Sequence, residues 1–376
     1  MRAKKPAEIL QRSGWSRSVG GVGPYLTLFS RGGTSREDVD AAVAKLQIHE
    51  LPVARGCTYV IPAADFGLGL TVGRQFNSDM KQAVKLGVTE NEIDKLCDAV
   101  VTALEKGPLD PDGIRDATGK ASRSLGEEGK KKGLTTTLPL ALGRLQTEGK
   151  IRRIPTNGRL DQQRYKYVNW SPSPLAKYPE SLDAAFVELA RRYFAWVGPA
   201  TLGEFQEFAG LGVKATKQVV ESLGLVPMEA GSDRVLLPTD VAAFKAYEAP
   251  SKPHYNLVSG LDPINANRRE IQTLIDAKDR ARSVMVDSKM EKLGDQVDLP
   301  SHAILDRGQL IGLWEFDVDS NSIVWATFSG KKDKALEAAI EETQSYVRDQ
   351  LGDARSFSLD SPKSRTERVQ SLRKLR

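Results

Sequence analysis

The stretch that most constrains the fold covers residues 134–170. Its first half, LTTTLPLALGRLQTEGKI, places Leu138, Leu142 and Leu145 on one side of a helix. Its second half, KIRRIPTNGRLDQQRYKYVNW, has the pattern of a basic two-stranded hairpin with a turn at Asn157-Gly158. A short helix that leads into a basic hairpin, after two preceding helices, is the layout of a winged helix. The sequence therefore predicts a winged-helix unit here.

The same order of elements occurs before and after this stretch. In the first unit, Thr34-Ser35 is a helix N-cap signal, and the short strands of ELPVARGCTYVIP follow the helix. The third unit, from about residue 181 to 238, aligns with the second without gaps, since Gly198-Pro199 matches Gly107-Pro108. A repeat of helix, Gly-Pro, helix, glycine, helix and hairpin predicts tandem winged helices.

The pattern changes from Tyr255 onward. The segments HAILDRG, QLIGLWEFDVDSN and SIVWATFSG predict a β-meander with turns at residues 306–308 and 319–321. A final helix follows, and the last sixteen residues, SPKSRTERVQSLRKLR, predict a mobile basic tail. The expected fold class is α+β, with tandem winged-helix (helix-turn-helix) units and a C-terminal β-barrel-like module. The expected boundaries are 1–75, 76–172 and 173–250 for the three units and 251–376 for the C-terminal module.

Composition restricts the class of protein without fixing its function. The 376 residues suffice for several domains, and the net charge of +5 permits a nucleic-acid partner without requiring one. Cys57 and Cys97 form no disulfide framework, which is typical of a cytoplasmic protein. The three histidines are far apart in sequence, and no apolar run has the length of a membrane helix. We therefore expect no metal, no cofactor and no membrane partner.

Double-stranded DNA is the partner that the charge pattern favours. In a winged helix the third helix enters the major groove and the hairpin lies over the backbone. Cations and hydroxyls at these places bind phosphate oxygens. The candidate DNA-binding residues are Lys131, Lys132, Thr135, Thr136, Arg144, Lys150, Arg152, Arg153, Arg159, Arg164 and Lys166. The third unit has a poorly charged wing, and we interpret it as a structural unit or a protein contact.

No common catalytic constellation is present. The chain lacks a Walker motif, a GxSxG motif and a cluster of metal-binding carboxylates. Asp65 and Asp262 could each be a buried base, but a helix or turn cap is the favoured interpretation. The glycines at residues 20–23 lack the spacing of a phosphate loop and favour a turn. Trp314 and Trp325 could stack on a base, but such tryptophans more often belong to a core.

Three segments resemble a known family. RGCTYVIPAAD at residues 55–65, RYFAWVGPATLGEFQEFAGLG at 192–212 and LDRGQLIGLWEF at 305–316 are similar to patterns of the AlkZ and YcaQ crosslink-repair DNA glycosylases. The segments occur in that family's order and span most of the chain. The resemblance implies tandem winged helices around a C-terminal β-barrel, with a channel for duplex DNA.

This sequence differs from the family pattern at the family's catalytic motif. Glycosylases of this family remove alkylated bases without a metal, and a Gln-x-Gln or Gln-x-Asp motif in the first unit positions the hydrolytic water. The motif is expected near residues 19–28, which here read VGGVGPYLTL and contain neither glutamine nor aspartate. No catalytic residue is therefore assigned from the resemblance.

Several functions remain open from the sequence. The favoured one is a non-catalytic protein that binds duplex DNA, including damaged DNA, in a cytoplasmic, nucleoid-associated setting. The alternatives are a divergent monofunctional DNA glycosylase whose water is held by another residue such as Asp262, a transcriptional regulator, and a structural protein whose wings contact protein partners.

Overall fold

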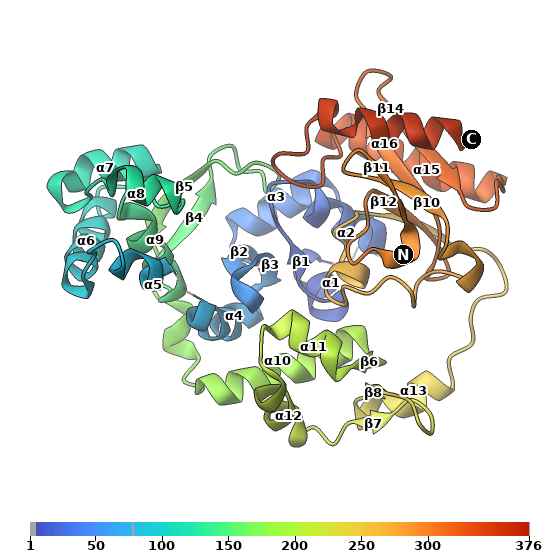
Figure 1. Ribbon diagram of the computed structural model, residues 1–376, viewed down its shortest axis with the longest axis horizontal. Helices are drawn as coiled ribbons and strands as arrows, with labels where there is room; N and C mark the ends of the chain where they lie inside the picture. Colours follow the sequence, from blue (N-terminus) through green and yellow to red (C-terminus); the bar gives the residue numbers. More distant parts are fainter. Residues whose placement is uncertain (1–4, 77–78, 376) are drawn as a thin grey trace.

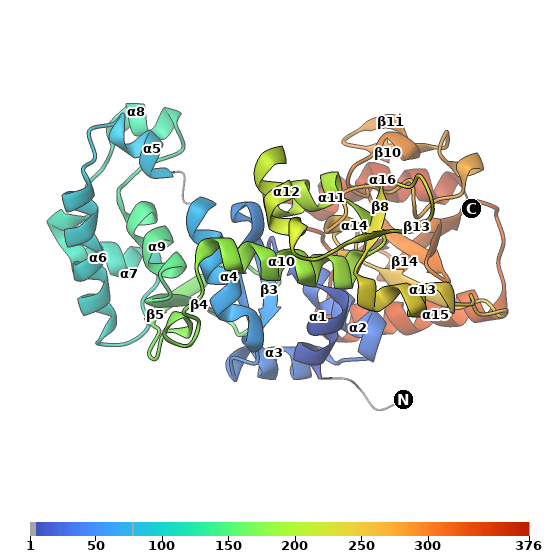
Figure 2. The ribbon, with the colours of Figure 1, turned by 90° about the horizontal axis from the view of Figure 1, so that it is seen from below.

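The computed structural model describes residues 5–76 and 79–375. The N-terminal unit lies at the centre, with residues 90–170 at one end and the C-terminal module at the other (Figure 1, Figure 2). The third unit packs beside the centre and is joined to the C-terminal module by an extended linker (Figure 1). Within the described residues, no helix combines the length and the apolar character needed to cross a membrane.

The first unit consists of three helices and a small sheet. Its elements are α1 (Pro6–Ser13), β1 (Ser16–Arg17), α2 (Gly23–Gly32), α3 (Arg36–Ala44), β2 (Ile48–Pro52) and β3 (Thr58–Pro62). Ser35 caps α3 by accepting a hydrogen bond from the backbone N–H of Asp38, which confirms the predicted N-cap. The strand order is β1-β3-β2, so the short strand after the first helix pairs with the last strand.

Helix α4 (Phe66–Gly73) is buried along its whole length and follows the first unit. Its glycines allow neighbouring segments to approach closely. A Cβ atom on Gly73 would lie 2.3 Å from the carbonyl oxygen of Pro52, and one on Gly67 would lie 2.3 Å from the Cβ of Tyr178. Glycines that weaken an isolated helix are therefore required here by packing.

The second unit repeats this order of elements. Helix α5 (Asp79–Val84) precedes it, and its elements are α6 (Glu90–Leu104), α7 (Pro111–Thr118), α8 (Gly126–Lys131), α9 (Leu138–Thr147), β4 (Ile151–Pro155) and β5 (Tyr165–Asn169). Thr89 caps α6 by accepting a hydrogen bond from the N–H of Glu92. Leu109, after the first helix, forms an antiparallel bridge with Tyr167 of the last strand.

The third unit has the same topology again. Its elements are α10 (Leu182–Val197), β6 (Ala200–Thr201), α11 (Leu202–Ala209), α12 (Val213–Glu221), β7 (Val226–Pro227), β8 (Arg234–Leu236) and the additional helix α13 (Val241–Lys245). The strand order β6-β8-β7 corresponds to β1-β3-β2 of the first unit. The second unit has the additional helix α8 between α7 and α9, so its third helix lies further along the chain than the gapless alignment with the third unit predicted.

The C-terminal module is built on one antiparallel sheet. Its elements are β9 (Tyr255–Val258), α14 (Pro263–Ala266), β10 (Ser283–Val286), β11 (Lys289–Lys292), β12 (His302–Asp306), β13 (Gln309–Asp317), β14 (Ser322–Thr327), α15 (Lys334–Tyr346) and α16 (Pro362–Lys374). The three strands of the predicted meander are confirmed, and the sheet order is β14-β13-β12-β9. In the described residues β14 and β9 remain edge strands, so the sheet is open and not the expected closed barrel.

Helices cover both faces of this sheet. Trp314 and other residues of one face pack in a core with Leu336 of α15 and with residues of the first unit. Leu313 and its neighbours on the other face pack with Leu372 of α16. Alternate residues of each strand therefore enter different cores. Trp314 is fully buried and Trp325 is 6% exposed, which confirms that both tryptophans belong to the core.

The last residues are a docked helix and not the mobile tail predicted from their charge. Arg365 is 1% exposed and forms an ion pair of 2.7 Å with Asp353. Arg368 binds Glu315 of the sheet at 2.8 Å. Arg368 and Arg373 are paired with acids of β13 more than fifty residues earlier in the chain, an arrangement that local composition cannot reveal. Residue 376 lies outside the described part of the chain.

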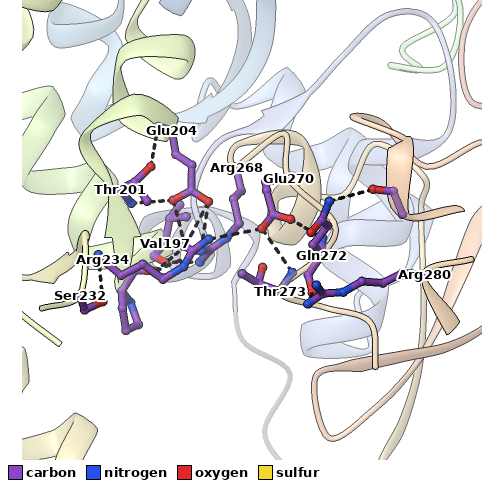
Figure 3. A network of polar contacts seen from close by, with 12 residues as sticks. Val197, Thr201, Glu204, Ser232, Arg234, Arg268, Glu270, Gln272, Thr273 and Arg280 are labelled. Atoms are coloured by element: carbon purple, nitrogen blue, oxygen red, sulfur yellow. Dashed lines mark hydrogen bonds and ion pairs between the residues drawn. The ribbon is translucent and has the colours of Figure 1, made fainter. Parts of the chain in front are cut away.

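Arginines connect the third unit to the C-terminal module (Figure 3). Arg234 of β8 binds both oxygens of Glu204 at 3.1 Å and reaches Glu270 at 3.3 Å. Arg268 lies 3.4 Å from Glu204, which also accepts a hydrogen bond of 2.7 Å from the backbone N–H of Thr201. Because Glu204 is only 8% exposed, its charge depends on both arginines for compensation.

Candidate nucleic-acid interface

Helix α9 offers little surface to a ligand. Six of its ten residues are buried, and it packs against α6 on one side and α4 on another. It begins at Leu138, so Thr135 and Thr136 precede the helix and do not form its first turn as we had predicted. A helix that reads a major groove needs an exposed polar face. The geometry therefore favours the β4–β5 hairpin over α9 as the contact surface.

Several of the predicted cations already have acidic partners. Lys131 and Lys150 form exposed ion pairs that contribute little to stability, whereas Arg144 and Arg159 are held in less exposed positions. Arg144 binds two carboxylates of α6, which lies about fifty residues earlier in the chain. The pairs are Lys131 with Glu128, Lys150 with Glu148, Arg144 with Glu90 and Asp94, and Arg159 with Asp161.

The remaining cations have no ion pair among the residues that the structure describes. They are Lys132, Arg152, Arg153, Arg164 and Lys166. The pairing of Arg153 with Tyr167 and of Ile154 with Lys166 places Arg152 and Lys166 on one face of the hairpin and Arg153 on the other. The two adjacent arginines thus point to different sides. Arg152 is half-buried, and burial lowers its pKa from the ordinary value, although a guanidinium remains charged.

The loop of this hairpin is fixed to the rest of the molecule. The predicted turn at Asn157-Gly158 is confirmed, with Gly158 in the left-handed region at φ 77°. Beyond it, Leu160 is buried in the core of the first unit, and its N–H donates to the hydroxyl of Tyr25 at 2.9 Å. Arg159 donates to the carbonyl oxygen of Leu351 at 2.9 Å. The loop therefore holds the second unit against both the first unit and the C-terminal module.

A buried carboxylate lies where this hairpin meets the first unit. Glu50 of β2 is 4% exposed and accepts a hydrogen bond from the hydroxyl of Ser18. The hydroxyl of Tyr165 also contacts Glu50, and burial is the main reason why the pKa of Tyr165 is raised. The guanidinium carbon of Arg153 lies 4.5 Å from the centre of the Tyr165 ring. Among the described residues Glu50 has no ion-pair partner, so hydroxyl groups are its polar neighbours.

Sequence reasoning did not identify Glu50. The available signal was a single acid within the apolar strand run of Ile48, Leu51 and Val53. Its neighbour His49 is also buried, and neither ring nitrogen has a hydrogen-bond partner in the described structure. Burial, followed by the charges of Arg152 and Arg153, lowers the pKa of His49 to about 3. His49 is thus a neutral side chain at physiological pH.

The two acids singled out in the sequence have structural partners. Asp262 is fully buried, binds the guanidinium of Arg31 through both oxygens at 2.6 and 2.7 Å, and caps α14. Asp65 accepts a hydrogen bond of 2.8 Å from the indole N–H of Trp15 and lies 3.2 Å from Arg192. The predicted capping role is confirmed for Asp262 and differs for Asp65, whose side chain caps no helix. Both oxygens of Asp262 are thus engaged by the protein, whereas the Oδ1 atom of Asp65 has no hydrogen-bond partner in the described structure.

The glycine cluster forms a packed turn, as the sequence favoured. A Cβ atom on Gly21 would lie 2.2 Å from the carbonyl oxygen of Ser356, and the N–H of Val22 donates to the carbonyl of Arg355 at 2.9 Å. These backbone groups are therefore engaged with the protein itself. In the described part of the chain, no three His, Cys, Asp or Glu side chains lie together in a way that could hold a metal ion.

The third unit has a more exposed third helix than the second. Lys214 and Lys217 of α12 are exposed and have no ion pair within the described residues. Lysines three residues apart lie on one side of a helix. This surface is a second basic candidate that our interpretation of the third unit did not include.

Comparison with known proteins identifies the family. The model of the family described as DNA glycosylase AlkZ-like matches residues 22–346. The chain belongs to this family. Among solved structures, the Streptomyces sahachiroi DNA glycosylase AlkZ has a TM-score of 0.67 and 17% sequence identity, and the match covers 94% of this chain and 93% of that chain. Likeness at this identity establishes a shared fold. No curated protein matches the sequence.

Membership of the AlkZ-like family confirms the resemblance noted in the sequence and associates the chain with DNA-repair glycosylases. The match begins at Val22 and therefore excludes β1, which carries Ser16 and Arg17. The hydroxyl of Ser18 donates to the buried Glu50, and Arg17 lines a cavity together with Gln163 of the hairpin loop.

Proposed function

We propose that this member of the AlkZ-like family binds duplex DNA, including alkylated or distorted DNA, through the β4–β5 hairpin. The observation that carries the proposal is the set of hairpin cations without acidic partners, Arg152, Arg164 and Lys166, in a unit whose other predicted cations are mostly paired. Phosphate groups supply the missing negative charge. Lys132 adds a further unpaired cation, whereas Arg153 is directed toward Tyr165.

We further propose that the three repeated units are winged helices. The support is their common topology, in which a short strand or bridge after the first helix pairs with the final hairpin strand. We retain 1–75, 76–172 and 173–250 as the boundaries of these units and 251–376 for the C-terminal module. The loop of the second unit contacts two other parts of the molecule, which supports a fixed presentation of its hairpin to DNA.

We infer that the family's usual water-positioning chemistry is absent from this chain. Residues 19–28 contain no glutamine or aspartate, and the glycines among them serve packing against residues 355 and 356. Asp262 is bound by Arg31 and by its own helix, which argues against it as a substitute. Binding without base removal is therefore the function we favour.

A second candidate is base removal with Glu50 as the base, and the observation that favours it is a buried carboxylate with no ion pair among the described residues. In this reaction water attacks the sugar C1′ atom, the N-glycosidic bond breaks with its electrons leaving on the base, and Glu50 accepts the proton of the water. The Glu50→Gln variant would lose base release while retaining duplex binding.

One experiment separates these functions. Labelled duplex, plain and alkylated, is titrated with the protein at two salt concentrations, and the products are treated with alkali to cleave abasic sites. Salt-sensitive binding without strand breaks is the result we expect. Breaks confined to alkylated duplex would establish base removal, and salt-independent or undetectable binding would refute both functions.

A further inference from the structure

The second unit has a hydrophobic core of its own. Among the residues that the structure describes, the buried side chains of this core all come from residues 83–167, and α6 and α9 supply most of them. Two side chains of the hairpin region enter other cores instead. Trp170 packs with residues of the first and third units, whereas Leu160 packs with the first unit and the C-terminal module. The buried apolar side chains of the second unit thus reach the other cores at two separate places.

One of these places is the base of the hairpin. The N–H of Trp170 donates to the carbonyl of Lys150 at 2.7 Å, just before β4 begins, and its ring lies 5.6 Å from that of Phe66. Close by, the Nε atom of Arg74 donates to the carbonyl of Thr147, the last residue of α9, at 3.3 Å. Helix α9 also contacts α4 of the first unit. The second unit is therefore joined to the centre of the molecule at the base of its hairpin.

The other place is the loop at the tip of the hairpin, which reaches toward the C-terminal module (Figure 1). Leu160 in this loop is only 1% exposed, and its N–H donates to the hydroxyl of Tyr25 at 2.9 Å. That hydroxyl in turn donates to the carboxylate of Asp40. The guanidinium of Arg355 donates to the carbonyl of Asp161. Apolar burial and hydrogen bonds from two other parts of the molecule thus hold the tip.

The proposed phosphate contacts are rigidly linked to this tip. Arg164 lies four residues after Leu160, and its carbonyl accepts a hydrogen bond of 2.9 Å from the N–H of Thr156 across the loop. Lys166 follows on β5, where it pairs with Ile154 of β4. The position of the tip therefore determines the direction in which both cations point.

We propose that the second unit is an arm that pivots at the base of its hairpin, and that Leu160 is the latch that holds the arm in the orientation that binds DNA. The inference rests on the proposed DNA binding and adds a conformational control of the same site. Release of the tip leaves the core of α6 and α9 intact, because that core contains no residue of the tip. Leu160 acts through the orientation of Arg164 and Lys166, so it is a positioning residue.

This arrangement makes DNA affinity depend on the fraction of molecules with a docked tip. A ligand that binds only one of two conformations has an apparent affinity reduced by the fraction of protein in that conformation. The bound state keeps the same phosphate contacts, so the slope of affinity against salt does not change. Because coupling between binding and conformation is reciprocal, bound DNA also stabilises the docked tip.

Hydrogen–deuterium exchange of the full chain tests the arm without DNA. In Leu160→Ala the tip loses its buried side chain, so peptides that cover residues 156–164 should exchange about tenfold faster than in the wild type. Peptides from α6 and α9 should keep their wild-type rates, because their core is separate. Leu134→Ala, which shortens a buried leucine in the second unit's own core, is the matched control and should leave exchange at the tip unchanged.

The anisotropy of a labelled duplex at several salt concentrations tests the latch. Leu160→Ala should bind about tenfold more weakly at every salt concentration, with the wild-type slope. Leu160→Met keeps the apolar volume and should restore affinity and slow exchange. Tyr25→Phe removes the acceptor of the Leu160 N–H and should change both quantities in the same direction as Leu160→Ala. Saturating duplex should slow exchange at the tip of Leu160→Ala.

Each measurement has a result that contradicts the proposal. Faster exchange throughout the second unit of Leu160→Ala would show that the tip belongs to the fold of that unit and would overturn the arm. Unchanged exchange at the tip, or faster exchange with wild-type affinity, would overturn the latch. A reduced salt slope would show that phosphate contacts are lost and would exclude a positioning role. Absence of duplex binding by the wild type would refute the proposed function, while the exchange rates would still decide whether the second unit is an arm.

Discussion

Removal of two hairpin cations tests the proposed interface most directly. Arg164 and Lys166 are exposed and have no ion pair among the described residues, so the double variant Arg164→Ala/Lys166→Ala should fold normally. If both side chains contact phosphates, duplex binding by the variant should depend less steeply on salt. The prediction is specific to these positions because the paired cations of the same unit are already partly neutralised.

The magnitude follows from counterion release. Each phosphate contact contributes about 0.9 to the slope of log K against log salt, so loss of two contacts should reduce the slope by about 1.8. This change corresponds to about 60-fold weaker binding near 0.1 M salt and to almost no difference when extrapolated to 1 M salt. Fluorescence anisotropy of a labelled duplex at four or more salt concentrations measures both quantities.

The charge-matched comparison is Lys214→Ala/Lys217→Ala, which removes two unpaired lysines from α12. If the hairpin is the interface, this variant should retain the wild-type slope. Equal losses in the two double variants would show that only net charge matters. A loss confined to the α12 variant would refute our choice of the hairpin and place the interface on the third unit.

Three further predictions concern stability. Because burial lowers the pKa of His49 to about 3 while an unfolded histidine titrates near 6.5, the stability present above pH 6.5 should fall by about 2 kcal/mol by about pH 5. His49→Phe should show a smaller loss in urea unfolding at the two pH values, and an equal loss would contradict this assignment. Glu204→Gln, which leaves two arginines without their carboxylate, should lower the free energy of unfolding by about 3 kcal/mol, and an unchanged urea midpoint would argue against a stabilising role. Gly21→Ala should lower the melting temperature because its Cβ would meet the carbonyl of Ser356, whereas Gly212→Ala, with open space around it, should not.

Local signals in the sequence were sufficient to predict several helix caps and strands. The cap at Ser35 and the strands of the meander were confirmed, because each depends on residues close together in the chain. The family resemblance rested on three separated segments and was confirmed by the family match. These features can be predicted without knowing which distant residues are in contact.

The candidate site could be predicted only in part. A basic hairpin was evident, and strand alternation alone places Arg152 and Arg153 on opposite faces. The sequence did not indicate that Glu90 and Asp94 of a distant helix engage Arg144. Nor did it indicate the cavity lined by Arg17, Gln163 and Phe357, which joins segments from both ends of the chain. Such features are set by packing between distant residues, for which a local pattern carries no signal.

The sequence by itself determined the strands of the C-terminal meander, the basic character of the hairpin and the lack of glutamine and aspartate in residues 19–28. Only the tertiary structure decided which cations remain unpaired, that the C-terminal sheet stays open, and that the basic end of the chain is a helix held by Arg365 and Arg368. The physical reason is that composition fixes how many charges and apolar groups a segment carries, whereas the three-dimensional arrangement of the segments fixes which partners they meet.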